Sequence, residues 1–176
     1  LCIATASVIA VDAIGTFAPR HAETRFDVSR DGASTRNDII IDTIRNVNGK
    51  SGVTHVTNSR ADFAERVCIA IPASRPHEEI ITLDELVDAR FISLAGSRRF
   101  RSICDELCAN RGFEPDVMFE SDNPAVVRKM ISLGLGVGFW PERSWGPVNG
   151  DDVIVLPLAD DDFSRTIRLE LTSRGL

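Results

Sequence analysis

Three short stretches of small and hydroxyl-bearing residues stand where an apolar strand is predicted to turn into a helix. The strands are expected over residues 1–4, 91–94 and 117–119. The first turn of a helix leaves backbone N–H groups without partners inside the helix, and such groups bind anions such as carboxylates. The sequence therefore predicts a site that binds a polar ligand. Its candidate residues are Thr5, Ala6, Ser7, Gly96, Ser97, Ser121 and Asp122.

Ser97 has two possible roles. Apolar residues at positions 100, 103, 104, 107 and 108 predict one continuous helical face, and Gly112 is expected to end this helix. Ser97 stands at its N-cap position, where a serine commonly bonds the first turn of its own helix. Capping alone and ligand binding are therefore both open for this residue.

Composition excludes several classes of protein. The 176 residues are 43% hydrophobic and 26% charged, which is typical of a soluble globular chain of one domain or two small lobes. No apolar run is long enough to span a bilayer, so we expect no membrane partner. The net charge of −6 argues against direct binding of a nucleic-acid backbone, which requires clustered Lys and Arg. The basic run at Arg98, Arg99 and Arg101 is interpreted as a solvated helix face.

Metal binding and catalysis find little support in the reactive residues. The four cysteines form no CxxC pair and have no metal-ligand spacing to the three histidines, so no metal or cofactor is predicted. Each cysteine lies in an apolar strand or on the apolar helix face, which predicts buried thiols in a reducing compartment. No Gly-x-Ser-x-Gly elbow is present, and no histidine has a clear nucleophile partner.

The predicted elements alternate in a way that favours an α/β fold with two lobes and a β-rich middle. Such sheets bind ligands beyond the carboxyl ends of their strands. The candidate residues are therefore expected to converge on a polar ligand, one with a carboxylate, held between the lobes. The elements are strands near residues 1–4, 25–29, 37–42, 53–59, 66–71, 91–94, 117–119, 137–140, 152–158 and 166–172, and helices near 8–18, 82–89, 98–111 and 124–133.

Eight stretches over nearly the whole chain resemble, in order and at natural spacing, the effector-binding domain of a LysR-type transcriptional regulator. They are residues 1–7 (LCIATAS), 37–42 (NDIIID), 66–72 (RVCIAIP), 81–86 (ITLDEL), 91–94 (FISL), 112–115 (GFEP), 119–122 (FESD) and 134–141 (GLGVGFWP). This resemblance implies the fold of type 2 periplasmic binding proteins, with two Rossmann-like lobes joined by a two-strand hinge. It implies that residues 1–67 and 153–176 form lobe I and residues 68–152 form lobe II.

The resemblance also implies a function. The chain is expected to be a cytoplasmic bacterial sensor, and not an enzyme, that binds a small effector in the cleft between the lobes. Ser7 and Ser97 would donate hydrogen bonds, and Thr43 would line the lobe I side. Relatives pair as antiparallel dimers, which implies a homodimer or homotetramer. The chain opens in mid-strand, so we expect a missing N-terminal winged helix-turn-helix that would bind the DNA.

One departure and two alternatives stand beside this interpretation. The family places a helix between its second and third strands, and here only residues 30–37 are available for it. A solute-binding protein of a transporter with the same fold is the main alternative. A catalytic alternative rests on Thr24-Arg25-Phe26, which matches a motif of prephenate dehydratases; in those enzymes the motif lies late in the catalytic domain, so we interpret the match as coincidence.

Overall fold

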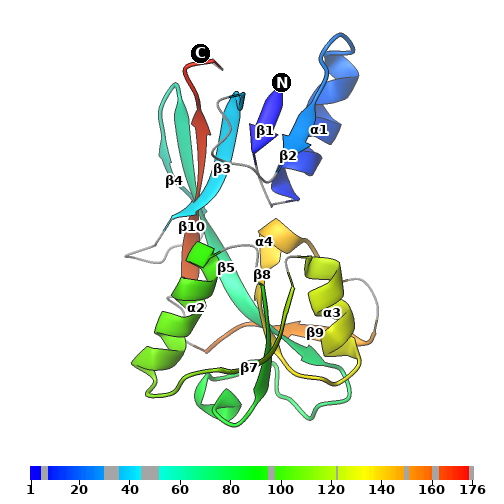
Figure 1. Ribbon diagram of the computed structural model, residues 1–176, viewed down its shortest axis with the longest axis vertical. Helices are drawn as coiled ribbons and strands as arrows, with labels where there is room; N and C mark the ends of the chain where they lie inside the picture. The colour runs from blue at the N-terminus through cyan, green and yellow to red at the C-terminus, as the bar shows by residue number, and fades with distance from the viewer. Residues whose placement is uncertain are drawn as a thin grey trace. The chain divides into compact units, whose positions relative to one another are not determined.

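The structure is a computed structural model that describes the chain except residues 5–7, 30–35, 45–51, 95–97, 122, 149–150, 160–162 and 175–176 and the side chains of 52–55, 94 and 98 (Figure 1). The chain forms two compact units, each described by itself. Unit 1 consists of Leu1–Arg66, Arg143–Gly146 and Ser164–Leu176, and unit 2 consists of Val67–Glu142 and Pro147–Phe163.

Unit 1 is built on a mixed sheet with the strand order β2-β1-β3-β10-β5-β4. β1 pairs in parallel with β2 and β3, whereas β10 pairs antiparallel with both β3 and β5. The strands are β1 (Cys2–Ala4), β2 (Asp27–Ser29), β3 (Ile39–Ile44), β4 (Gly52–Val56), β5 (Arg60–Pro72) and β10 (Ser164–Leu171). The predicted connection from the first strand to a helix is present, because α1 (Ile9–Phe17) follows β1 and continues into η1 (Ala18–Arg20).

Unit 2 contains a second set of strands around the far half of β5. β8 and β9 pair antiparallel with residues of β5 from Val67 onward, and β6 pairs in parallel with β7. These strands are β6 (Arg90–Leu94), β7 (Asp116–Ser121), β8 (Gly138–Pro141) and β9 (Val153–Leu156). The remaining elements named in this half of the chain are η2 (Asp84–Leu86), α2 (Arg98–Asn110), α3 (Pro124–Ser132) and α4 (Glu142–Trp145), the last of which lies mostly in unit 1.

The core of unit 2 depends on a close approach between β6 and the segment that leads into β8. The backbone N–H of Ile92 donates to the Val137 carbonyl at 2.7 Å, and the N–H of Val137 donates to the Arg90 carbonyl at 2.8 Å. A Cβ at Gly136 would lie 2.5 Å from the Arg90 carbonyl oxygen, and one at Gly138 would lie 2.9 Å from the Ile92 oxygen. Gly136 and Gly138 are therefore required for this pairing.

Several expectations are corrected by the structure. The helix predicted over residues 82–89 is a single 3-10 turn, η2. The Thr82 N–H and hydroxyl both donate to the Glu85 carboxylate, and no side chain of the described residues caps the backbone N–H groups at the start of η2. The strand predicted at 66–71 is the longer β5. β9 belongs to unit 2, where it pairs with Ile69–Pro72 of β5.

The predicted burial of the four thiols is found for three of them. Cys68, Cys104 and Cys108 are buried, whereas Cys2 is half-buried, and all four are free thiols. The short connection at 30–35, expected to lack the family's helix, lies outside the described residues.

Candidate functional site

Two of the eight predicted ligand-binding residues lie in the described part of the chain. Thr43 is near the carboxyl end of β3 in unit 1, and Ser121 is the last residue of β7 in unit 2. Both strands belong to parallel pairs, β1 with β3 and β6 with β7, as the ligand-binding prediction requires. The other predicted residues lie outside the described residues: they are Thr5, Ala6, Ser7, Gly96, Ser97 and Asp122.

Thr43 is buried against a charged side chain from the last strand. Its hydroxyl oxygen accepts a hydrogen bond from Nη1 of Arg165 at 2.9 Å, and both residues are buried. Its backbone N–H donates to the Asp42 carboxylate at 2.8 Å. The Thr43 side chain is thus held in one orientation by a guanidinium, which is the kind of fixed polar group that a ligand site needs.

Arg165 is held in turn by Glu65. The Nε of Arg165 donates to Oε2 of Glu65 at 2.6 Å, and the side chains are 6% and 1% exposed. Ser144 of α4 donates its hydroxyl to the same Oε2 at 2.9 Å and its backbone N–H to Oε1. We call Thr43, Glu65, Ser144 and Arg165 the Glu65 network. Each of these hydrogen bonds joins a buried donor to a buried acceptor, which offsets the cost of removing the charges from water.

Ser121 bonds its own turn. Its hydroxyl oxygen accepts from the Asn123 N–H at 3.2 Å, and the Asn123 side chain accepts from the Ala125 N–H at 2.9 Å as the N-cap of α3. Pro124 takes the first position of this helix, as its residue type predicts. A hydroxyl that accepts here can still donate its hydrogen, so the local role of Ser121 is compatible with ligand binding.

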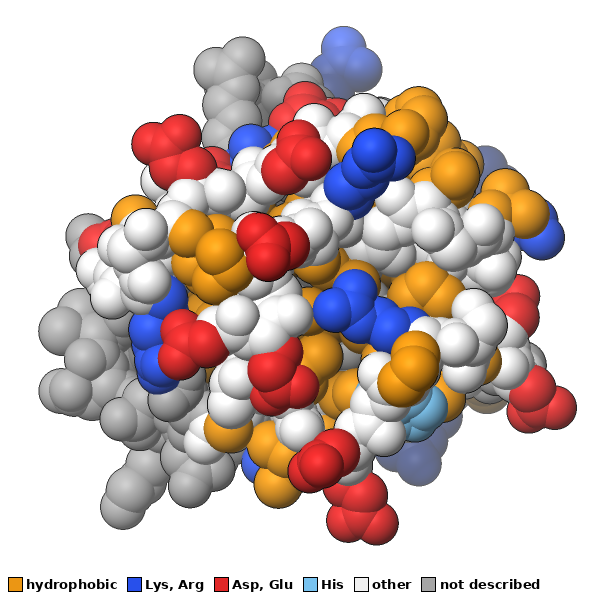
Figure 2. All heavy atoms as spheres, turned by 90° about the horizontal axis from the view of Figure 1, so that it is seen from below, with side chains coloured by type: hydrophobic (Ala, Val, Ile, Leu, Met, Phe, Trp, Pro, Cys, Tyr) orange, Lys and Arg blue, Asp and Glu red, His pale blue; other side chains and the backbone are white. Residues whose placement is uncertain are grey.

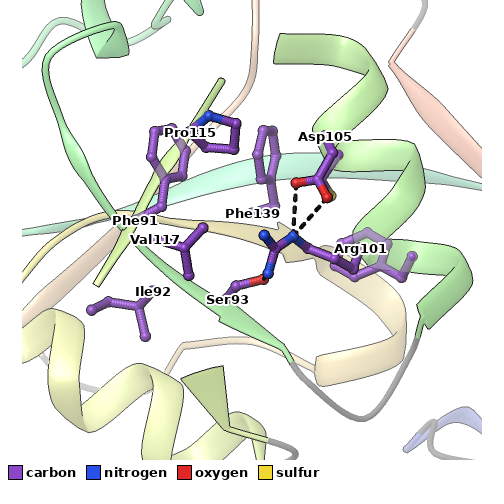
Figure 3. A pocket seen from close by; sticks show the side chains of 10 residues that line it. Phe91, Ile92, Ser93, Arg101, Asp105, Pro115, Val117 and Phe139 are labelled. Atoms are coloured by element: carbon purple, nitrogen blue, oxygen red, sulfur yellow. Dashed lines mark hydrogen bonds and ion pairs between the residues drawn. The ribbon is translucent and has the colours of Figure 1, made fainter. Parts of the chain in front are cut away.

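A small cavity lies under α2 in unit 2 (Figure 3). Its volume of about 20 Å³ is room for about one water molecule, which is too little for an organic effector. Arg101 lines it, and its Nε lies 2.7 and 2.8 Å from the two Asp105 oxygens. Arg101 also bonds Ser93 at 3.3 Å and Glu120. The prediction of a fully solvated basic face is thus wrong for Arg101, because two carboxylates hold its side chain partly buried.

The described part of the chain contains no group that suggests catalysis or a metal. Burial raises the pKa of the Cys108 thiol to about 11, and the neighbouring Asp105 adds to this shift, so the reactive thiolate is disfavoured. No cluster of three or more His, Cys, Asp and Glu side chains with the geometry of metal ligands occurs among the described residues.

The surface fits the acidic composition. Figure 2 shows one face on which acidic side chains are spread and basic side chains do not gather into a single patch. This distribution gives that face no stripe of positive charge for a nucleic-acid backbone. In the helices that the structure describes, length and apolar character together fall short of what a membrane span needs.

The Glu65 network was missed by the sequence reasoning, which had identified only Thr43 among its members. Glu65 and Arg165 are 100 positions apart in the chain, and Arg165 stands beside an acidic turn that reads as solvated surface. A weak signal was available, because both residues interrupt runs of strand-forming residues. Nothing in the sequence alone says that two such interruptions pair.

Comparisons with known proteins agree with this architecture. The family model of the LysR substrate binding domain matches residues 2–170. The HTH-type transcriptional regulator CysB of Burkholderia cenocepacia is 23% identical over 136 residues, 71% of this chain and 44% of that protein. The matched segments cover between 28% and 44% of the length of the curated relatives.

Solved structures have the same fold. The cofactor-binding domain of the Cbl transcriptional regulator superposes with a TM-score of 0.74 at 22% identity, covering 98% of this chain and 79% of that one. The effector binding domain of QuiR, solved in complex with shikimate, gives a TM-score of 0.66 at 15% identity, covering 98% of this chain and 85% of that one.

Proposed function

This chain belongs to the LysR substrate-binding domain family, and from that premise we propose that it is the ligand-sensing domain of a transcriptional regulator. The family match over residues 2–170 is the observation on which the proposal rests. The fold is the two-lobed, periplasmic-binding-protein-like α/β fold of its structural neighbours. The relatives are transcriptional regulators and the family is non-enzymatic, so the chain is not an enzyme.

The proposed effector is a small molecule with a carboxylate group. Support comes from the predicted helix starts after β1 and β6, whose N–H groups favour anions. QuiR binds shikimate, which is a carboxylate, in a domain of the same fold. We propose that Thr5, Ala6, Ser7 and Thr43 of lobe I and Gly96, Ser97, Ser121 and Asp122 of lobe II contact this effector. Its location between the lobes is part of the same proposal.

The response to the effector is proposed to be a change in a larger assembly. We propose that the full protein is a cytoplasmic homodimer or homotetramer and that its DNA contacts come from an N-terminal winged helix-turn-helix. Support comes from relatives named as HTH-type regulators, of whose own length the matched segments cover only 28% and 44%. Effector binding would shift the assembly by binding one arrangement of subunits more tightly than another. A transporter's solute-binding protein is the less favoured alternative, because the relatives are regulators.

Ligand binding is tested by thermal unfolding with shikimate, glutamate and citrate, each compared with its methyl ester. A carboxylate at a hundredfold excess over its Kd is expected to raise Tm by about 5–10 °C. The methyl ester, which lacks the charge, is expected to raise it much less. An ester that stabilises as well as its acid would contradict the carboxylate preference.

Ser97 gives a sharper test at the proposed site. For a carboxylate that binds, Ser97→Ala is expected to weaken binding by about 1–3 kcal/mol, because a buried anion would lose one hydrogen-bond donor. Isothermal titration measures this change. An unchanged affinity would leave Ser97 as the cap of α2 and remove it from the proposed site.

A further inference from the structure

Glu65 links two parts of unit 1 that belong to or adjoin the proposed effector site. On one side, its Oε2 holds Arg165, whose Nη1 donates to the Thr43 hydroxyl at 2.9 Å. On the other side, its carboxylate holds the N–H and hydroxyl of Ser144. The Ser144 carbonyl then accepts from the Val8 N–H at 2.9 Å, directly before α1. One carboxylate therefore sets the positions of Thr43 and of the start of α1.

The same carboxylate also joins the segments through which the chain leaves unit 1. The chain passes between the units after Arg66, Glu142, Gly146 and Phe163. Glu65, Ser144 and Arg165 each lie within two residues of one of these points. If one of these segments moved relative to the others, the hydrogen bonds of Glu65 to Ser144 or to Arg165 would have to stretch or break.

We infer that Glu65 is a positioning residue for effector binding: it fixes Thr43 and Val8 relative to each other before any ligand arrives. This inference rests on the proposed function, which assigns Thr43 and the residues before Val8 to the effector site. A site that is already ordered loses less conformational freedom when it binds, so its affinity is higher. Burial strengthens the effect, since the hydrogen bonds of the network do not compete with bulk water.

Asp62 supplies a matched control on the same strand. It is also a buried carboxylate, and it bonds Arg168 of β10 at 2.9 and 3.1 Å and Arg60 of its own strand. In the ladder between β5 and β10, Arg168 stands opposite Asp62 as Arg165 stands opposite Glu65. The two carboxylates thus lie on the same strand and bond an arginine of the same partner strand. The hydrogen bonds to Ser144, whose carbonyl accepts from the Val8 N–H, are made by Glu65.

The test uses the domain without ligand, labelled with ¹⁵N and with ¹³C in its threonine methyl groups, and compares wild type, Glu65→Gln and Asp62→Asn by NMR. We expect Glu65→Gln to speed hydrogen exchange of the Val8 N–H and the Arg165 Nε–H by about tenfold or more, after correction for global stability. The order parameter of the Thr43 methyl group is expected to fall in the same variant. Asp62→Asn is expected to leave all three signals within about twofold of wild type.

Two results would overturn the inference. Equal acceleration by both variants would show that Glu65 only stabilises the fold, and no acceleration by Glu65→Gln would show that it positions neither segment. If Glu65→Gln does not fold, Ser144→Ala takes its place, because it removes one donor to Glu65 and keeps the backbone bonds. That variant should speed exchange at Val8 and leave the Arg165 Nε–H unchanged, and an unchanged Val8 rate would refute the inference.

The outcome is independent of the effector. Exchange rates and order parameters are measured in the free domain, so a failure of shikimate, glutamate and citrate to bind would count against the proposed function alone. A failure of the exchange test would count against the role of Glu65 alone.

Discussion

Two pairs of a carboxylate and an arginine lie on the same ladder of unit 1 but differ in burial and in the segments that they link. Glu65 and Arg165 are opposite each other across β5 and β10, and so are Asp62 and Arg168. Three positions separate the pairs along each strand, so they lie on opposite faces of the sheet. The Glu65 pair is buried on both sides, whereas the Arg168 side chain is 27% exposed. A carboxylate paired with an arginine thus forms a fully buried link on one face and a partly exposed ion pair on the other.

The surroundings decide which role each pair has. Around Glu65, the partners are the backbone N–H and the hydroxyl of Ser144 and the guanidinium of Arg165, from two segments far apart in the chain. Around Asp62, the partners are two arginines on the same two strands. A buried pair with several partners is costly to break, while an exposed pair is screened by water and salt.

The largest effect is expected for Glu65→Gln. The substitution leaves the positive charge of Arg165 buried without its counter-charge, which costs about 3–5 kcal/mol in the free energy of unfolding. Denaturant unfolding followed by circular dichroism measures this loss. A loss below about 1 kcal/mol would mean that water reaches the pair and that the contrast with Asp62 is not one of burial.

A smaller loss is expected for Asp62→Asn. Both arginine partners can turn to water when the charge is removed, so the cost is that of charged hydrogen bonds, about 1–3 kcal/mol. The same unfolding experiment should rank this variant below Glu65→Gln. The reverse order would break the comparison.

The pH dependence of stability should reveal Asp62 directly. Hydrogen bonds from Arg168 and then Arg60 hold the pKa of the Asp62 carboxyl well below its usual range, against the opposing effect of burial. Because the folded-state pKa is lower than the unfolded value of about 3.9, the unfolded chain binds the extra proton. The ionised Asp62 carboxylate therefore adds to the free energy of unfolding above about pH 5, and this stabilisation is lost as the pH falls below about 4.

Unfolding measured from pH 7 to pH 2.5 checks this expectation. The difference in stability between wild type and Asp62→Asn should shrink toward the acid end. A difference that stays constant with pH would show that the carboxyl keeps its ordinary pKa in the folded state.

The smallest effect is expected for a pair in unit 2. Arg128 of α3 bonds Asp152 at 2.5 Å, and the two side chains are 31% and 46% exposed. Asp152→Asn should cost about 0–1 kcal/mol, and added salt should reduce even that. Unfolding at low and at high salt completes a series of three carboxylates ordered by burial. A cost as large as that of Asp62→Asn would show that exposure does not set the order.

Short sequence patterns, such as a glycine after a helix, predicted local structure well. A strand precedes a helix at α1, α2 and α3 as predicted, and Gly112 and Gly134 adopt positive φ after the ends of α2 and α3. Each of these signals is complete within a few neighbouring residues, so it needs no knowledge of tertiary structure. The predicted α/β fold was confirmed by the family match and the structural neighbours.

Contacts between segments far apart in the chain could not be predicted from the sequence. Thr43 was selected for its place at a strand end, but its guanidinium partner comes from β10, 122 positions later. The capping pattern at Thr82 predicted a helix, and the chain forms one 3-10 turn there instead. A charged residue within a strand gives no sign of which face it occupies until the register with its neighbour is known. The ligand roles of Ser7 and Ser97 stay predictions.

The position of β10 has a consequence for how the chain is made. In the finished sheet β10 lies between β3 and β5, yet in chain order it comes after all the other strands of unit 1. The earlier strands of unit 1 must therefore wait for it, while residues 67–163 already include every segment of unit 2. Domains fold as their segments are synthesised. We expect unit 2 to be native first, and truncation before residue 164 to leave β3 and β5 without the strand that lies between them.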